Sequence, residues 1–126
     1  MMKMIWGLSG FVVLALVLGG CAQQSDPSEV VERYITARVE GDAGTLQSLS
    51  CAAWEAQAAI QAESFRAVDA ELEGMDCQRT GEENGFAVVS CEGRIVTTYD
   101  GEEREWELGS YLVEQADGEW RLCGEA

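Results

Sequence analysis

The sequence predicts an α+β fold in which N-terminal helices pack on a curved, four-stranded antiparallel meander sheet. Two observations carry this prediction. Apolar residues recur at three- and four-residue spacing as far as residue 68, and from residue 69 onward they alternate with polar ones. Three turn signals then divide the alternating part into strands near 70–79, 86–99, 103–115 and 119–124.

The first 20 residues are typical of a secretory signal peptide. Lys3, the sole lysine, precedes an apolar run from Met4 to Leu18 that is short of a ~30 Å hydrocarbon core. Leu18-Gly19-Gly20-Cys21 resembles the bacterial lipobox, in which two small residues admit the peptidase and the cysteine thiol carries the lipid. The alternative is an ordinary signal peptide with an incidental cysteine. We expect a lipoprotein with a signal peptide at 1–20, a lipidated tether at 21–25 and a single domain at 26–126.

This interpretation places the domain in the cell envelope, outside the cytoplasmic membrane, anchored by acyl chains such as palmitate on Cys21. Ala22, rather than an aspartate, follows the cysteine, which resembles outer-membrane sorting in bacteria with two membranes. The chain carries a formal net charge of −15, and removal of the signal peptide takes away one lysine and no acid. So acidic a surface argues against nucleic acid as a partner and against peripheral binding to anionic lipid head groups, and it favours a solvated surface.

Two capped helices are expected at the start of the domain. Asp26 caps the first helix, Pro27 suits its first position and Gly41 ends it. Asp42 then caps a short second helix. The apolar residues that give these helices an inward face are Val30, Val31, Tyr34, Ile35, Leu46 and Leu49.

A third helix and three turns complete the expected elements. Residues 52–68 are rich in Ala, Gln and Glu, and the larger apolar side chains there are Trp54, Ile60, Phe65 and Val68. The turn signals are Gly81-Glu82-Glu83-Asn84-Gly85, Asp100-Gly101 and Asp117-Gly118. The two Asp-Gly pairs are typical of type I′ hairpins.

The Asp100-Gly101 turn predicts a strand register. A two-residue turn places Tyr99 opposite Glu102, and the pairs that follow are Ile95–Trp106, Gly93–Leu108 and Val89–Leu112. These pairs are mostly apolar, as a half-buried sheet requires. A two-residue turn at Asp117-Gly118 places Leu112 opposite Cys123, whereas a three-residue turn places it opposite Leu122.

Four cysteines besides Cys21 predict two disulfides in an exported domain. The first hairpin places Cys77 across from Cys91. Cys123 lies a whole strand from Cys91, which is ~10 Å and exceeds the ~7 Å limit between bridged Cα atoms. With strands in sequential order, the remaining connectivity is Cys77–Cys91 with Cys51–Cys123. Zinc is the competing interpretation, but the chain has no histidine and no Cys-x-x-Cys pair.

Two stretches resemble nuclear transport factor 2-like domains. One is Val30-Val31-Glu32-Arg33-Tyr34 with Gly41-Asp42, and the other is Tyr111-Leu112-Val113 with Asp117-Gly118-Glu119-Trp120. The resemblance covers most of the mature chain and implies a cone-shaped fold, like that of ketosteroid isomerases, polyketide cyclases and many lipoproteins of unknown function. A cystatin-like fold has a similar pattern. Such folds host both enzymes and non-catalytic binders.

The resemblance supplies one candidate catalytic residue. Tyr34 falls where isomerases of this family place the tyrosine that donates to an oxyanion, a role that needs a general base in a dry pocket. The family's aspartate motif is absent, and Asp69 and Asp76 are the nearest carboxylates. The alternative, which we favour, is that Tyr34 is a core aromatic with its hydroxyl at the mouth of the cone. The residues that either line an apolar pocket or fill a small core are Trp54, Trp106 and Trp120.

Other chemistries find no support in the sequence. Without histidine, Ser-His-Asp and Cys-His catalysis are excluded, and no glycine-rich phosphate loop suggests a cofactor. Residues 102–107 alternate outward acids with an inward Trp106, which indicates a protected strand edge more often than a calcium site. Our first hypothesis is therefore a lipid-anchored, non-catalytic module that binds a small apolar ligand or an envelope protein. An isomerase- or cyclase-like enzyme and a structural envelope domain are the alternatives.

Overall fold

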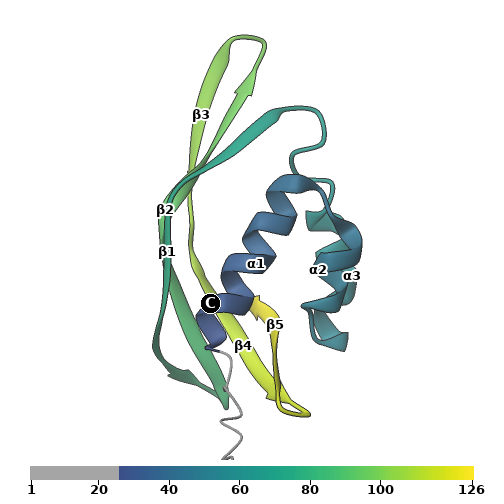
Figure 1. Cartoon of the computed structure of the whole chain (residues 1–126), viewed down its shortest axis with the longest axis vertical. Helices are drawn as coiled ribbons and strands as arrows, with labels where there is room; N and C mark the ends of the chain where they lie inside the picture. The colour runs from purple at the N-terminus through teal and green to yellow at the C-terminus, as the bar shows by residue number, and fades with distance from the viewer. Residues whose placement is uncertain (1–25) are drawn as a thin grey trace, which may run out of the picture.

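The computed structural model describes residues 26–126, so the signal peptide, lipobox and tether predicted for 1–25 lie outside the described residues. The described chain is α+β, with its helices against one face of a curved antiparallel sheet (Figure 1). No helix in this part of the chain is long and apolar enough to cross a bilayer. The elements are α1 (Pro27–Glu40), α2 (Ala43–Ser48), η1 (Ala52–Trp54), α3 (Glu55–Gln61), β1 (Asp69–Glu83), β2 (Phe86–Tyr99), β3 (Glu102–Glu107), β4 (Ser110–Ala116) and β5 (Glu119–Glu125).

The first two helices begin and end where the sequence predicts. The Asp26 carboxylate accepts a hydrogen bond from the Ser28 N–H at 2.9 Å, and Gly41 ends α1 in the left-handed conformation at φ 69°. The Asp42 carboxylate caps α2 by accepting from the N–H and hydroxyl of Thr45. All of the inward residues expected from helical spacing are buried: Val30, Val31, Tyr34, Ile35, Leu46 and Leu49.

The third helix is much shorter than the expected 52–68. It consists of the 3₁₀ turn η1 followed by α3, and after Gln61 the chain continues in turns as far as residue 67. The N–H groups of Glu63 and Ser64 bond to the third preceding carbonyl rather than the fourth, as in a 3₁₀ turn, and the α-helix therefore ends here. This turn segment brings Phe65 back toward the C-terminal end of α1, where its ring lies under Arg38.

All three hairpin turns contain two residues with positive φ. The Asp100-Gly101 and Asp117-Gly118 turns are confirmed, with Tyr99 paired to Glu102 and Ala116 paired to Glu119. The first turn is also a two-residue turn, at Asn84-Gly85, and it is shorter than the expected loop at 81–85. β1 consequently runs to Glu83 instead of ending near residue 79.

The sheet has five strands rather than four, because the third expected strand is divided. β3 and β4 both pair with the same edge of β2, and Leu108 and Gly109 lie between them. Glu92 is the extra residue on β2: the Leu108 N–H bonds to the Gly93 carbonyl and the Cys91 N–H bonds to the Gly109 carbonyl. This bulge displaces the register by one residue.

The predicted registers are therefore correct only near the turns. Ile95 does pair with Trp106, but beyond the bulge Val89 pairs with Tyr111, so its expected pairing with Leu112 is wrong. A second irregularity between Leu112 and Val113 pairs Leu112 with Gly124 in place of either expected partner, Cys123 or Leu122.

The bulges also bend the sheet. Gly74 and Gly93 lie opposite one another with φ of 64° and 103°, and a Cβ on Gly93 would lie 2.6 Å from the backbone of Gly74. We call residues 94–107 beyond this bend the open hairpin, and residues 26–61, 75–92 and 108–126 the helix-covered region. In Figure 1 the open hairpin extends past the helices.

Both disulfides and most of the core lie in the helix-covered region, and the core also includes Ala62 of the turn segment and Ile95 of the open hairpin. Val31, Leu46, Val89, Val113 and Leu122 have no exposed surface. The expected pairing of the cysteines is present: the Cα atoms are 5.3 Å apart in Cys51–Cys123 and 4.0 Å apart in Cys77–Cys91. The Cys51–Cys123 disulfide joins the helical layer to β5. It lies next to an isolated parallel β-bridge between the backbones of Ser50 and Leu122.

Candidate functional site

Tyr34, the candidate oxyanion donor, is buried and belongs to a chain of hydrogen bonds that ends at the exposed Glu125. The Tyr34 hydroxyl donates to Gln61 Oε1 at 2.6 Å and accepts from Trp54 Nε1 at 3.0 Å. Gln61 Nε2 in turn donates to the Glu125 carboxylate at 3.1 Å. Burial raises the pKa of Tyr34, which keeps the phenol protonated as a donor. Because the hydroxyl donates its one proton in the hydrogen bond to Gln61, it links α1 to α3 and, through Gln61, to Glu125 at the end of β5.

The structure places neither of the two expected carboxylates beside the Tyr34 hydroxyl. Asp69 and Asp76 are both exposed on β1, and Asp69 borders a polar surface with Glu71, Glu73 and Glu103. Catalysis by Tyr34 would need an acceptor within hydrogen-bond distance of a bound substrate. The side chains that contact its hydroxyl are those of Trp54 and Gln61, and both support its position instead.

The three candidate tryptophans occupy different environments. Trp54 is half-buried beside Tyr34, and Trp120 is half-buried with the Arg79 guanidinium 5.7 Å from its ring centre. Trp106 lies on the sheet face that is turned toward the helices, as expected, yet it is 50% exposed because no helix of residues 26–126 covers β3. Its indole N–H donates to the Thr97 hydroxyl at 3.0 Å, which fixes the ring on the sheet.

Trp106 forms one wall of a groove between the open hairpin and the turn segment 62–68. We call this feature the aromatic groove. It consists of two adjoining hollows of about 330 and 370 Å³ that share Ser64, Phe65 and Trp106. Binding sites for small molecules have volumes of about 300 to 1,000 Å³ and mostly apolar walls. The apolar side chains of the groove are Phe65, Val68, Tyr99, Trp106, Ile95, Leu108 and Tyr111.

The strand register explains why these side chains share a face. Ile95, Thr97 and Tyr99 alternate along β2, and their partners on β3 are Trp106, Arg104 and Glu102. The opposite wall is the turn segment, which begins where α3 ends at Gln61 and is not helical. Early termination of α3 and the bend of the sheet thus create the groove together.

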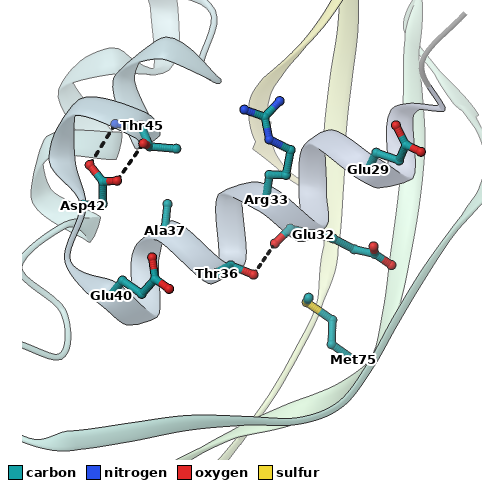
Figure 2. A pocket seen from close by; sticks show the side chains of 9 residues that line it. All are labelled: Glu29, Glu32, Arg33, Thr36, Ala37, Glu40, Asp42, Thr45 and Met75. Atoms are coloured by element: carbon teal, nitrogen blue, oxygen red, sulfur yellow. Dashed lines mark hydrogen bonds between the residues drawn. The ribbon is translucent and has the colours of Figure 1, made fainter. Parts of the chain in front are cut away.

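A hollow larger than either hollow of the aromatic groove lies between α1, α2 and Met75 of β1 (Figure 2). Its volume is about 570 Å³, and it contains the acidic residues Glu29, Glu32, Glu40 and Asp42. Asp42 caps α2 there, and Glu32 accepts from the Cys77 N–H at 3.3 Å. Two of the four acids therefore have structural roles, and the aromatic groove is the better candidate for a binding site.

Within the described residues, the acid and cysteine side chains close enough to share an ion are Cys51, Cys123 and Glu114. The two sulfurs are joined in a disulfide, so this group offers a single carboxylate. Its chemistry is poor for zinc, which prefers thiolate or imidazole ligands.

Sequence reasoning identified Trp106 as a possible pocket residue and missed the opposite wall. Helical spacing places Phe65 and Val68 in a continuous helix, which hides the turn that carries them. The signal for Tyr99 is its position next to an Asp-Gly turn, because an aromatic residue there lies at the exposed end of a hairpin. No protein-family model, no curated protein and no solved structure matches this chain.

Proposed function

We propose that this protein is a non-catalytic binding module, lipid-anchored through Cys21 on the extracytoplasmic side of the membrane, that binds a small apolar ligand in the aromatic groove. One observation carries the proposal. Large apolar side chains are exposed at three positions of the described chain, and two of them, Trp106 and Tyr99, line the same groove. Exposed aromatic surface that gathers in a hollow is a common mark of a ligand or partner site.

Three features support the location and the fold type. The lipobox-like segment ending at Cys21 favours the anchor, and two disulfides favour an oxidising compartment. The chain enters α1 at the end of the molecule opposite the open hairpin (Figure 1), so the groove would face away from the membrane. Three short helices followed by an antiparallel sheet agree with a nuclear transport factor 2-like or cystatin-like domain.

The side chains of the groove favour binding over catalysis. The groove contains no arrangement of a base beside a nucleophile, and its hydroxyl groups are those of Ser64, Thr97, Tyr99 and Tyr111. Tyr34, the residue on which an isomerase-like function would depend, points its hydroxyl at Gln61 instead. An envelope protein is the second candidate partner, because the outer edge of β3 is unpaired within the described sheet and Trp106 lies beside it.

The proposal is tested by photo-crosslinking the full-length chain, exported and kept in its native membrane. The probe is a neutral dodecanol analogue that carries a diazirine at the end of its chain. We expect labelled peptides from residues 62–68 and 95–111, and a loss of most of that labelling in Trp106→Ala because the probe loses its main apolar wall.

The matched control is Ile60→Ala, which removes another exposed apolar side chain, from α3 and outside the groove. Tyr34→Phe serves as a second control, and it should leave the labelling unchanged. The proposal fails if the probe labels no groove peptide, or if Ile60→Ala lowers the labelling as much as Trp106→Ala does.

A further inference from the structure

The arginines of this chain divide into two groups by their partners. All 23 acidic residues and every arginine lie in the described residues 26–126. Arg66, Arg79, Arg94 and Arg121 each have a carboxylate oxygen within 4.0 Å. The remaining three have none in this part of the chain: Arg33, Arg38 and Arg104.

Two of these three arginines line the aromatic groove, Arg104 in the hollow of about 330 Å³ and Arg38 in the adjoining hollow of about 370 Å³. Arg38 extends from α1 and Arg104 from β3. Arg38 is half-buried, its guanidinium lies 5.5 Å from the centre of the Phe65 ring, and its Nε donates to the Ser64 hydroxyl at 3.4 Å. Both contacts are with uncharged groups. In so acidic a chain, the two guanidiniums at its apolar groove therefore keep most of their donors free for an anion.

The groove also contains two carboxylates, and they limit the charge of the ligand. Glu102 and Glu107 are exposed, and neither lies within 4.0 Å of Arg38 or Arg104. Hydrated carboxylates at the rim repel an anion less than a nearby guanidinium attracts it, but they oppose a ligand with several negative charges.

From this arrangement we infer that the ligand of the aromatic groove is a single-chain amphiphile with one anionic head group. This inference rests on the proposed binding function and adds the chemical class of the ligand. The apolar chain lies against Phe65, Val68 and Trp106, and the head group accepts hydrogen bonds from the arginines at the rim. A trimethylammonium head group of the same chain length cannot accept these bonds, and the hydroxyl of an alcohol accepts weaker ones because it carries no charge.

The test repeats the crosslinking with three chain-matched diazirine probes: dodecanoate, dodecanol and dodecyltrimethylammonium. We expect dodecanoate to label the groove peptides at least about fivefold more than dodecanol, the ratio for one charge-assisted hydrogen bond at a partly exposed site. Arg38→Gln and Arg104→Gln should each lower dodecanoate labelling severalfold and leave dodecanol labelling within about twofold. Comparing each variant with the wild type cancels differences in how the probes partition into the membrane.

The matched control is Arg94→Gln, which removes the same charge from the same hairpin on the face away from the groove, where Arg94 pairs with Glu73. Arg104 is exposed, so its variant should fold even if loss of Arg38 loosens Phe65. Equal labelling by dodecanoate and dodecanol overturns the inference and leaves the proposed function standing. Stronger labelling by the ammonium probe, or an equal effect of Arg94→Gln, also overturns it. Labelling of the groove by none of the probes removes the proposed function itself.

Discussion

The helix-covered region and the open hairpin share one sheet and differ in almost everything else. In the helix-covered region, Val89, Val113 and Leu122 are completely buried, and both disulfides are found there. In the open hairpin, every residue of β3 is exposed, including Trp106. Buried and half-buried residues alternate in parts of β4 and β5, whereas Trp106 is the one apolar residue of β3.

This difference teaches that alternation decides which face a side chain occupies, and that the neighbouring layer decides whether it is buried. Ile95 and Trp106 are cross-strand partners on one face, yet Ile95 is 3% exposed and Trp106 is 50% exposed. The helical layer covers Ile95 at the base of the hairpin and ends before Trp106. An apolar residue left beyond that layer is therefore available to bind a ligand.

The largest expected effect comes from removing the longer disulfide of the helix-covered region. Cys51→Ala with Cys123→Ala opens a connection between residues separated by 72 positions, and the loop-entropy model gives a loss of about 4 to 5 kcal/mol. The corresponding loss for Cys77→Ala with Cys91→Ala, separated by 14 positions, is about 3 kcal/mol. Urea unfolding of both variants checks this order, and a larger loss from the shorter loop would contradict it.

Truncation of an apolar side chain should distinguish the two regions next. Leu122→Ala leaves a cavity where the side chain was wholly buried, and it should cost about 2 to 5 kcal/mol. Tyr99→Ala removes a side chain that is 63% exposed at the end of the open hairpin, and it should cost less than about 1 kcal/mol. Similar losses in urea unfolding would show that the open hairpin is as tightly packed as the core.

The same distinction explains what could be predicted from the sequence. Helix caps, inward helix faces, two-residue turns and the cysteine pairing were predictable because each depends on residues close in sequence or on strand order. Asp26, Gly41 and the two Asp-Gly turns show this directly. The end of α3 was not predictable, because no glycine or proline marks it and the contact of Phe65 with Arg38 depends on the tertiary structure.

The bulge at Glu92 could not be predicted from the sequence for a related reason. A glycine inside a strand, such as Gly93, indicates an unusual backbone conformation. Position 93 requires glycine because of the backbone of Gly74 on the neighbouring strand, which lies 19 positions earlier in the sequence. The division of β3 from β4 follows from that bulge. Consequently the candidate site, which depends on both the bend and the end of α3, could be predicted only through Trp106.

Substitution of two glycines with positive φ tests whether the bend holds the regions apart. Gly93→Ala combines a φ of 103° with a Cβ 2.6 Å from the Gly74 backbone, and it should cost at least about 2 to 3 kcal/mol. Gly101→Ala also has a positive φ of 78°, but nothing lies within 4 Å of its Cβ, so about 1 kcal/mol is expected. Thermal unfolding gives both values, and equal losses would mean that the close approach at the bend is readily relaxed.

The smallest effect is expected at the start of α1, and it depends on pH. Hydrogen bonds from the Ser28 N–H and hydroxyl hold the pKa of Asp26 below its ordinary value, so the ionised carboxylate stabilises the folded state. Because the folded pKa is the lower one, this stabilisation is complete above the unfolded pKa of about 4 and is lost as the pH falls through the folded pKa. Asp26→Ala should therefore cost about 1 kcal/mol near neutral pH, and its difference from the wild type should shrink below about pH 4. Ser28→Ala, which removes only the hydroxyl donor, should show a smaller gap that closes in the same range. A gap in urea unfolding that persists unchanged to low pH would mean that Asp26 acts through its shape, and that its charge contributes nothing to the helix.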